Sequence, residues 1–278
     1  MTTLDRWNEI IAAPEEEINL AEAALLIAAQ EYPGLDVPAY LARIDEIAAT
    51  LKRRMRADIS PTDALVALNR YLFEELGFAG NVADYYDPRN SYLNEVLDRR
   101  LGIPITLSLV HVEIGRRIGL AMHGVAFPGH FLVKCSLRNG AVVMDSYARG
   151  ASLSLEDLQQ RLKVLRGGAA PAPDMVAQLL AAAGRKSILA RLLRNLKNIY
   201  RERGDLARAL AAADRIIALE PAVAEEYRER AGIYHDMECF RAALSDFRNY
   251  LMLKPSAEDA ALVQRRVVEL QQIAGRLN

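Results

Sequence analysis

His130 and Asp145 are the residues whose types and spacing point most directly to chemistry. Each is predicted to lie on a strand, downstream of a helix that begins at Pro104. An imidazole oriented by a carboxylate can activate a nucleophile at the start of a helix, which is one geometry for acyl transfer. The helix starts with Pro104, Ile105 and Thr106, so no cysteine stands there. Thr106 is the best local candidate, since its hydroxyl is the only nucleophilic group in that triplet.

The same three residues also have structural interpretations, which the residue types favour. A threonine in the first turn of a helix commonly hydrogen-bonds to backbone. A hydrogen bond between His130 and Asp145 would tie two strands together, with Gly129 permitting a close approach of the chain. Binding of a ligand by His130 and Asp145 is the second interpretation, and catalysis is the third.

A dense polar stretch comes directly before the helix that begins at Pro104. Its members are Asn90, Ser91, Asn94, Arg99 and Arg100. Asn90 or Ser91 can cap a short helix predicted over 87–100, and the arginines suit the C-terminal end of a helix dipole. Alternatively, Asn90, Ser91, Asn94 and Arg100 form the rim of a cleft above His130. The sequence leaves both interpretations open.

The two cysteines, Cys135 and Cys239, are too few and too far apart for a disulfide framework or a zinc motif. Both are predicted to be buried core thiols, because free cysteine is commonly buried. We expect no metal or cofactor, since the four histidines are dispersed and no nucleotide-binding loop is present. The cysteine usage predicts a reducing, cytoplasmic location. The N-terminus lacks a signal-peptide pattern, and no apolar run approaches the ~18 residues of a membrane span.

The 278-residue chain has a formal net charge of −1, which gives no general reason to expect nucleic-acid binding. The charges are nevertheless uneven: acids dominate residues 1–50 and bases dominate 161–208. Two solvated helical faces of opposite sign are the simplest explanation. A basic groove for an acidic peptide or protein partner is the alternative. A third interpretation is an assembly factor whose basic segment 185–208 docks on an acidic partner or an RNA–protein complex. Nucleic acid is the weakest partner class, because no aromatic residues alternate with these bases.

Hydrophobic periodicity and turn residues define the expected elements. Helices are predicted over 18–30, 37–55, 60–76, 87–100, 104–118 and 153–165, and strands over 125–137 and 141–147. Ser60 followed by Pro61 is a typical helix start. Arg138-Asn139-Gly140 predicts a hairpin turn between the strands. The stretch 167–173, GGAAPAP, predicts a linker.

A repeat follows the linker. Pro221 and Pro255 are 34 residues apart, and the same offset aligns Tyr200 with Tyr234 and Ala209 with Ala243. This is the period of tetratricopeptide repeats, which are pairs of helices with small residues where the helices cross. Two positions depart from that pattern. Lys197 stands where the second repeat has Ala231, and Gly204 becomes Glu238.

Long motifs resemble one bacterial family. The segments YYDPRNSYLNEVLDRRLGIPITLSL, GVAFPGHFLV and VMDSYARGASLSLEDL closely resemble the SirB-type family, whose central domain is similar to the transglutaminase core. The resemblance implies an α+β, predominantly helical fold: a papain- or transglutaminase-like core with a small antiparallel sheet, a helical N-terminal region and C-terminal tetratricopeptide-like repeats. We expect divisions at 1–80, 81–166 and 174–278. In active enzymes with this core, a cysteine, a histidine and an aspartate act together. His130 and Asp145 match the last two, and the cysteine is absent.

The preferred hypothesis is therefore a non-catalytic interaction or regulatory protein whose core keeps a cleft for a protein or peptide, with the repeats as a second binding surface. The alternative is an acyl-transfer enzyme of peptidase, amidase or transglutaminase type, using His130 and Asp145 with a nucleophile such as Thr106. The sequence does not define an oligomeric state.

Overall fold

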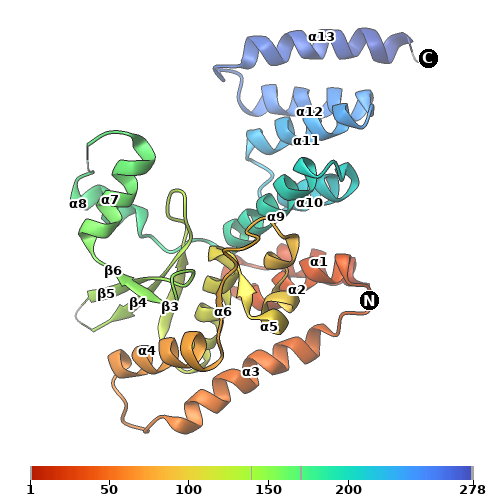
Figure 1. The fold of residues 1–278 in the computed structure, drawn as a ribbon. Helices are drawn as coiled ribbons and strands as arrows, with labels where there is room; N and C mark the ends of the chain where they lie inside the picture. The colour runs from red at the N-terminus through yellow and green to blue at the C-terminus, as the bar shows by residue number, and fades with distance from the viewer. Residues whose placement is uncertain (1, 139, 170, 277–278) are drawn as a thin grey trace. The chain divides into compact units, whose positions relative to one another are not determined.

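The N-terminal half of the chain is a set of helices around one buried helix, followed by a small sheet (Figure 1). The computed structural model describes residues 2–138, 140–169 and 171–276. The chain divides into two compact units, Met1–Ile188 and Leu189–Asn278, each described here by itself.

Side-chain caps define where the first helices start. The helical elements of this region are α1 (Thr3–Ala12), η1 (Glu15–Glu17), α2 (Leu20–Glu31), α3 (Val37–Arg54), α4 (Pro61–Asn69) and the π-helical η2 (Arg70–Glu75). Asn19, Asp36 and Ser60 each accept a hydrogen bond from the backbone amide three residues later, as N-cap residues do. The predicted helices 18–30, 37–55 and 60–76 are confirmed with small shifts at their ends.

The centre of the first unit is α6 (Pro104–Arg117), whose residues Pro104 to Gly115 are all buried. It is preceded by β1 (Ala79–Gly80), η3 (Pro88–Asn90), α5 (Leu93–Arg99) and β2 (Leu101–Gly102). Strands β1 and β2 form a short parallel pair. The predicted helix 87–100 is thus a 3₁₀ turn followed by a shorter α-helix.

A four-stranded antiparallel sheet follows α6, in the order β3-β4-β5-β6. Its strands are β3 (Ala121–Val125), β4 (Leu132–Leu137), β5 (Gly140–Asp145) and β6 (Ala151–Leu153). Leu137 pairs with Gly140, so β4 and β5 form the expected hairpin, and Asn139 of its predicted turn lies outside the described residues. The single strand predicted over 125–137 is wrong, because the chain turns between β3 and β4. Strand β6 was not predicted.

Helices α7 (Leu155–Arg166) and α8 (Pro173–Leu179) cover part of this sheet. Leu158 and Leu162 of α7 and Val176 of α8 pack with Val125 of β3 and Phe127. The predicted helix 153–165 is therefore confirmed as α7. Within the predicted linker, Gly167 ends α7 with φ of 65°.

The second unit contains the predicted helical repeats. Its helices are α9 (Arg185–Glu202, whose first residues belong to the first unit), α10 (Leu206–Leu219), α11 (Ala224–Asp236), α12 (Phe240–Leu253) and α13 (Ala260–Arg276). Gly204 and Glu238 occupy the same place in successive helix pairs, and both have positive φ, 73° and 59°. Glu238 thus adopts the left-handed turn that favours glycine, so the departure from the pattern leaves the turn unchanged.

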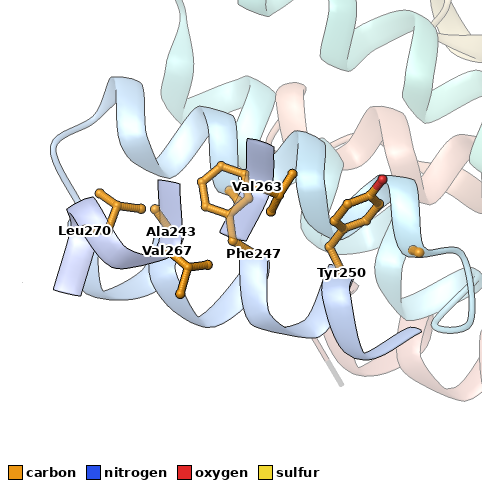
Figure 2. Packing of buried hydrophobic residues seen from close by; sticks show 8 residues of the cluster. Ala243, Phe247, Tyr250, Val263, Val267 and Leu270 are labelled. Carbon is orange, nitrogen blue, oxygen red and sulfur yellow. The ribbon is translucent and has the colours of Figure 1, made fainter. Parts of the chain in front are cut away.

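One apolar cluster of this unit lies between the last three helices. Figure 2 shows Phe247 and Tyr250 of α12 gathered with Val263, Val267 and Leu270 of α13. The fold class predicted from the sequence, α+β and predominantly helical with a small antiparallel sheet, is confirmed. Among the described helices, none combines the length and the apolar character needed to cross a bilayer.

Candidate functional site

His130 is held in a tight turn between β3 and β4. Its amide donates a hydrogen bond to the Phe127 carbonyl oxygen at 3.0 Å, across Pro128 and Gly129, and Gly129 has φ of 70°. Proline at the first central position and a positive-φ residue at the second are typical of a type II turn. The prediction that His130 lies on a strand is therefore wrong, because the Pro-Gly pair turns the chain just before β4 begins.

Asp145 is the last residue of β5, and its carboxylate pairs with the His130 ring. Nε2 of His130 lies 2.9 Å from Oδ1 of Asp145. The same oxygen accepts hydrogen bonds from the backbone amides of Tyr147 at 3.1 Å and Ala148 at 3.3 Å, so the carboxylate also shapes the turn after the strand. The Asp145 side chain is 3% exposed and that of His130 is 22% exposed. The predicted pairing of these two residues is thus observed.

Arg161 of α7 is a second partner of the acid, and the sequence reasoning missed it. Both Nη1 and Nη2 lie 2.9 Å from Oδ2 of Asp145. A signal was present: Arg161 directly precedes Leu162 and stands one turn after Leu158, both buried, so it lies at the edge of the buried face of α7. A cation in that position needs a counter-charge or solvent.

These contacts determine the charge of the cluster formed by His130, Asp145 and Arg161. Burial by itself raises the pKa of Asp145, because it disfavours the charged form. Hydrogen bonds from His130 and Arg161, together with the favourable electrostatic effect of both side chains, outweigh burial, and the pKa of Asp145 lies below its ordinary value. Asp145 is therefore an ionised carboxylate at neutral pH.

An open groove of about 390 Å³ borders this charged cluster. Its lining includes Pro128, Gly129, His130, Arg161, Val164 and Leu165. Val164 is 73% exposed and Leu165 is 56% exposed, so α7 presents two large apolar side chains beside an imidazole and a guanidinium. A groove of this composition, named here the core groove, can bind an apolar group and a hydrogen-bond acceptor together.

A series of aromatic rings in edge-to-face contact extends from His130 to the surface. Ring centroids are 6.4 Å apart for His130 and Tyr147, 6.0 Å for Tyr147 and Tyr85, and 5.2 Å for Tyr85 and Tyr86, all in edge-to-face geometry. Gly80 is required here, because a Cβ at that position would collide with the ring of Tyr147. Tyr86 is 63% exposed, so this series of rings reaches the surface.

Thr106 lacks the solvent access that a nucleophile needs. Its side chain is fully buried, at 0% exposure. Its hydroxyl accepts a hydrogen bond from the Ile103 amide at 3.1 Å and lies 2.8 Å from the Asn90 carbonyl oxygen, to which it donates. This is the structural interpretation of Thr106: the hydroxyl satisfies the backbone at the start of α6. Ile105, its neighbour, is buried and apolar.

The four residues suggested as a cleft rim are not among those that line the core groove. Asn90, Ser91 and Asn94 are buried, while the exposed Arg100 donates to the Leu76 carbonyl oxygen at 2.7 Å. Capping of the following helix by Asn90 or Ser91 is also wrong. Helix α5 has Tyr92 as its N-cap, with no side-chain cap.

Asn90 instead holds the preceding loop. Its side-chain amide donates to the Asp84 carbonyl oxygen at 2.7 Å, and its Oδ1 accepts from Asn81 at 3.0 Å. These hydrogen bonds anchor the loop, whose residues 82–86 are exposed, to the buried Asn90. The Asn90 side chain is therefore not available to cap α5.

The two cysteines differ in environment. Cys135 of β4 is buried, as predicted, and burial raises the pKa of its thiol. Cys239 is exposed, so the prediction of a buried thiol there is wrong, because the residue lies in the turn between α11 and α12. Neither residue lines the core groove. Across the described residues, no cluster of three or more potential metal-ligating side chains occurs.

The basic segment 185–208 is largely engaged within the chain. Lys197 pairs with Glu226 at 2.8 Å and with Glu229, and Arg194 pairs with Glu226 at 2.6 Å. Lys197 is only 2% exposed. Its charge is therefore neutralised inside the repeat unit, which weakens the interpretation of 185–208 as a docking surface.

Comparisons with known proteins agree with this architecture. A family model for the transglutaminase-like superfamily matches residues 38–194, and one for the tetratricopeptide repeat matches residues 196–267. A UPF0162 protein of Xylella fastidiosa is 40% identical over 271 residues, which are 96% of this chain and 95% of the relative. A UPF0162 protein of Pseudomonas aeruginosa is 32% identical over 92% of each chain. Protein SirB1 of Salmonella typhimurium is 22% identical over 87% of this chain and 90% of its own length.

Proposed function

This chain belongs to the SirB-type family, which joins a transglutaminase-like domain to tetratricopeptide repeats, and from that premise we propose that it is a non-catalytic protein-interaction or regulatory protein. In this proposal the core groove binds an extended segment of a partner protein. The repeats provide a second surface for a partner.

The proposal rests on the absence of an accessible nucleophile at the start of α6, within residues 104–106. The one hydroxyl there, on Thr106, is buried and hydrogen-bonded to backbone. Loss of a triad nucleophile typically leaves only about 10³–10⁴-fold acceleration over water, which is too little for an ordinary hydrolase. An acyl-transfer function using Thr106 would require that hydroxyl to leave its backbone partners and reach solvent.

The composition of the core groove supports a peptide as its occupant. Val164 and Leu165 offer apolar surface for one side chain of the partner. The Arg161 guanidinium and the His130 ring can bind a carbonyl or carboxylate oxygen beside it. A short extended segment carries both kinds of group at the required spacing, since its side chains and carbonyl groups alternate along the backbone.

We place this function in the cytoplasm and without a cofactor. Both cysteines are free, and a protein with an exposed thiol such as Cys239 suits a reducing compartment. The partner is proposed to be a protein or peptide rather than a nucleic acid, because Arg194 and Lys197, within the basic segment 185–208, are engaged with acids of the same chain.

The test compares two leucines of α7. Leu165 lines the core groove, while Leu155 is an exposed leucine at the start of the same helix and does not line it. A photo-crosslinking amino acid placed at Leu165 should capture a partner in living cells, and one at Leu155 should not. With that partner purified, Leu165→Glu should weaken binding by about tenfold or more, as expected for a central apolar contact, and Leu155→Glu should leave it within about twofold.

A covalent probe tests the catalytic alternative. Reaction of the wild-type protein with a fluorophosphonate or acyl-ester probe, lost in Thr106→Ala, would contradict the proposal. Equal binding of the captured partner to Leu165→Glu and Leu155→Glu would contradict the assignment of the core groove.

A further inference from the structure

The repeat unit contains a second cavity, about 560 Å³ in volume, between α11, α12 and α13. It is named here the repeat groove. It is lined by Arg228 of α11, Phe247 of α12, Asp259 before α13, and Leu262, Val263, Arg265, Arg266 and Glu269 of α13. Phe247 and Val263 are nearly buried and lie close together (Figure 2). Leu262 is 62% exposed. The groove therefore has an apolar floor and a partly charged edge.

The preceding pair of helices shows what fills the corresponding place. Lys197 of α9 reaches Glu226 and Glu229 of α11, and this ion-paired side chain is buried. Its neighbour Arg194, one turn earlier, also binds Glu226. Charged side chains thus occupy the space between the first helices of successive repeats.

Adding the 34-residue period to Lys197, Glu226 and Glu229 gives the corresponding positions in the next pair of helices. Ala231 corresponds to Lys197, Ala260 to Glu226 and Val263 to Glu229. None of the three can form an ion pair, and two are alanines. The long side chain that fills the first interval is therefore missing from the second. Of the three replacements, Val263 lines the repeat groove, while Ala231 is fully buried in the apolar cluster.

The three arginines that line the repeat groove differ in whether they have an acidic partner. Arg228 is paired with Asp259, and Arg266 lies 3.2 Å from Glu269 and 3.0 Å from Nε2 of His235. Arg265 is exposed and has no acidic partner in the described part of the chain. One cation beside an apolar groove is therefore not neutralised.

We propose that the repeat groove binds an acidic segment of a partner protein, which places one apolar side chain against Phe247 and Val263 and a carboxylate against Arg265. This inference deepens the proposed function and rests on the repeats serving as a partner surface. Charge complementarity selects the occupant: an apolar residue flanked by acids satisfies both the floor and the unpaired cation. A basic segment would bring like charge next to Arg265.

The binding test uses the full chain and three fluorescein-labelled peptides. They are the acidic peptide GSDELFEDSG, its basic counterpart GSKKLFKKSG, and GSDEGGEDSG, which keeps the acids and lacks the apolar pair. Fluorescence anisotropy should show binding of the first, with at least about tenfold weaker binding of the other two. Affinity should fall as salt rises, because part of it comes from an exposed charge pair.

Variants locate the binding site. Arg265→Glu should weaken binding of the acidic peptide by about tenfold, while the matched control Arg248→Glu, an exposed arginine of α12, should leave it unchanged. The double variant Ala231→Lys/Val263→Glu rebuilds the ion pair of the first repeat and should abolish binding while circular dichroism stays that of the wild type. Should that variant unfold, Arg265→Glu alone decides.

Two results would overturn the inference. One is equal binding of the acidic and basic peptides. The other is loss of acidic-peptide binding in Leu165→Glu with none in Arg265→Glu, which would move the peptide to the core groove. That second result would leave the proposed function of the core intact, whereas labelling of Thr106 by an acyl probe would remove the core's function and leave the repeat groove untouched.

Discussion

Two buried carboxylates, one in each unit, have closely similar electrostatic surroundings, but only Asp145 has partners that line the core groove. Asp145 is paired with His130 and Arg161, and Glu226 with Lys197 and Arg194. Burial raises the pKa of each acid, and the side chains that hydrogen-bond to it lower the pKa by more than burial raises it. The His130 side chain is 22% exposed and borders a groove, whereas that of Lys197 is 3% exposed.

The difference teaches that exposure of one member does not by itself make a charge cluster a binding site: Arg194 is 31% exposed, but no member of the Glu226 cluster lines the core groove or the repeat groove. Around Glu226 every cationic partner is used to join α9 to α11. Around Asp145 the acid joins β5 to α7, but the His130 ring also forms part of the core groove. The Glu226 cluster is therefore structural, and the Asp145 cluster has both a structural and a binding role.

The largest expected effect comes from Lys197→Ala. Removing one member of a buried ion pair leaves its partner charged and poorly solvated, which typically costs about 3–5 kcal/mol. Urea unfolding followed by circular dichroism should show this loss. The exposed Arg248→Ala, in the same unit, should change the free energy of unfolding by less than about 0.5 kcal/mol. Comparable values for the two variants would mean that the Lys197 cluster is not structural.

The next largest effect is a difference in the free energy of unfolding between Asp145→Ala and His130→Ala. Asp145→Ala leaves Arg161 and two backbone amides without their acceptor, which we expect to cost about 2–4 kcal/mol in the free energy of unfolding. His130→Ala removes a partly exposed ring and should cost about 1 kcal/mol or less. Thermal unfolding of both variants measures this contrast. Equal losses would contradict a mainly structural role for the acid.

The sequence predicted those parts of the fold that local chemistry determines. Ser60 followed by Pro61 located the start of α4, and hydrophobic periodicity located α2 and α3. The caps Asn19 and Asp36 of those two helices were not predicted. The 34-residue period likewise located the repeat helices. The pairing of His130 with Asp145 followed from the family resemblance.

Other features could not be predicted because they depend on distant contacts. The partnership of Arg161 with Asp145 requires α7 to pack on β5, which no local pattern specifies. Asn90 has the residue type of a helix cap, but tertiary contacts with Asn81 and Asp84 use its side chain instead. The Pro128-Gly129 turn was a local signal, and it was outweighed by the apolar run around it.

A smaller effect concerns His111, which is buried in α6 next to Ser146. Burial lowers the pKa of His111 to about 3, so the ring stays neutral in the folded protein. The unfolded chain takes up a proton near the ordinary value of about 6.5, so stability falls as pH drops below that value. The slope contributed by this residue is about 1.4 kcal/mol per pH unit.

His111→Gln tests this slope. Urea unfolding between pH 7 and pH 5 should show a weaker decline for the variant than for the wild type, whatever its stability at pH 7. Parallel declines would show that the His111 ring is protonated in the folded state.

The smallest effect concerns the thiols. Cys239→Ser should change the free energy of unfolding by less than about 0.5 kcal/mol, because the residue is exposed. Iodoacetamide should modify one thiol in the folded wild type and none in this variant, since burial protects Cys135 and raises its pKa. Modification of Cys135 at a similar rate would contradict its placement in the core.

The most direct test of a non-catalytic core is a comparison of wild type with His130→Ala across a panel of amide and ester substrates. Because Thr106 is buried and bonded to backbone, we predict that the two proteins hydrolyse or transfer every substrate at the same background rate. Turnover by the wild type that disappears in a folded His130→Ala protein would contradict the account.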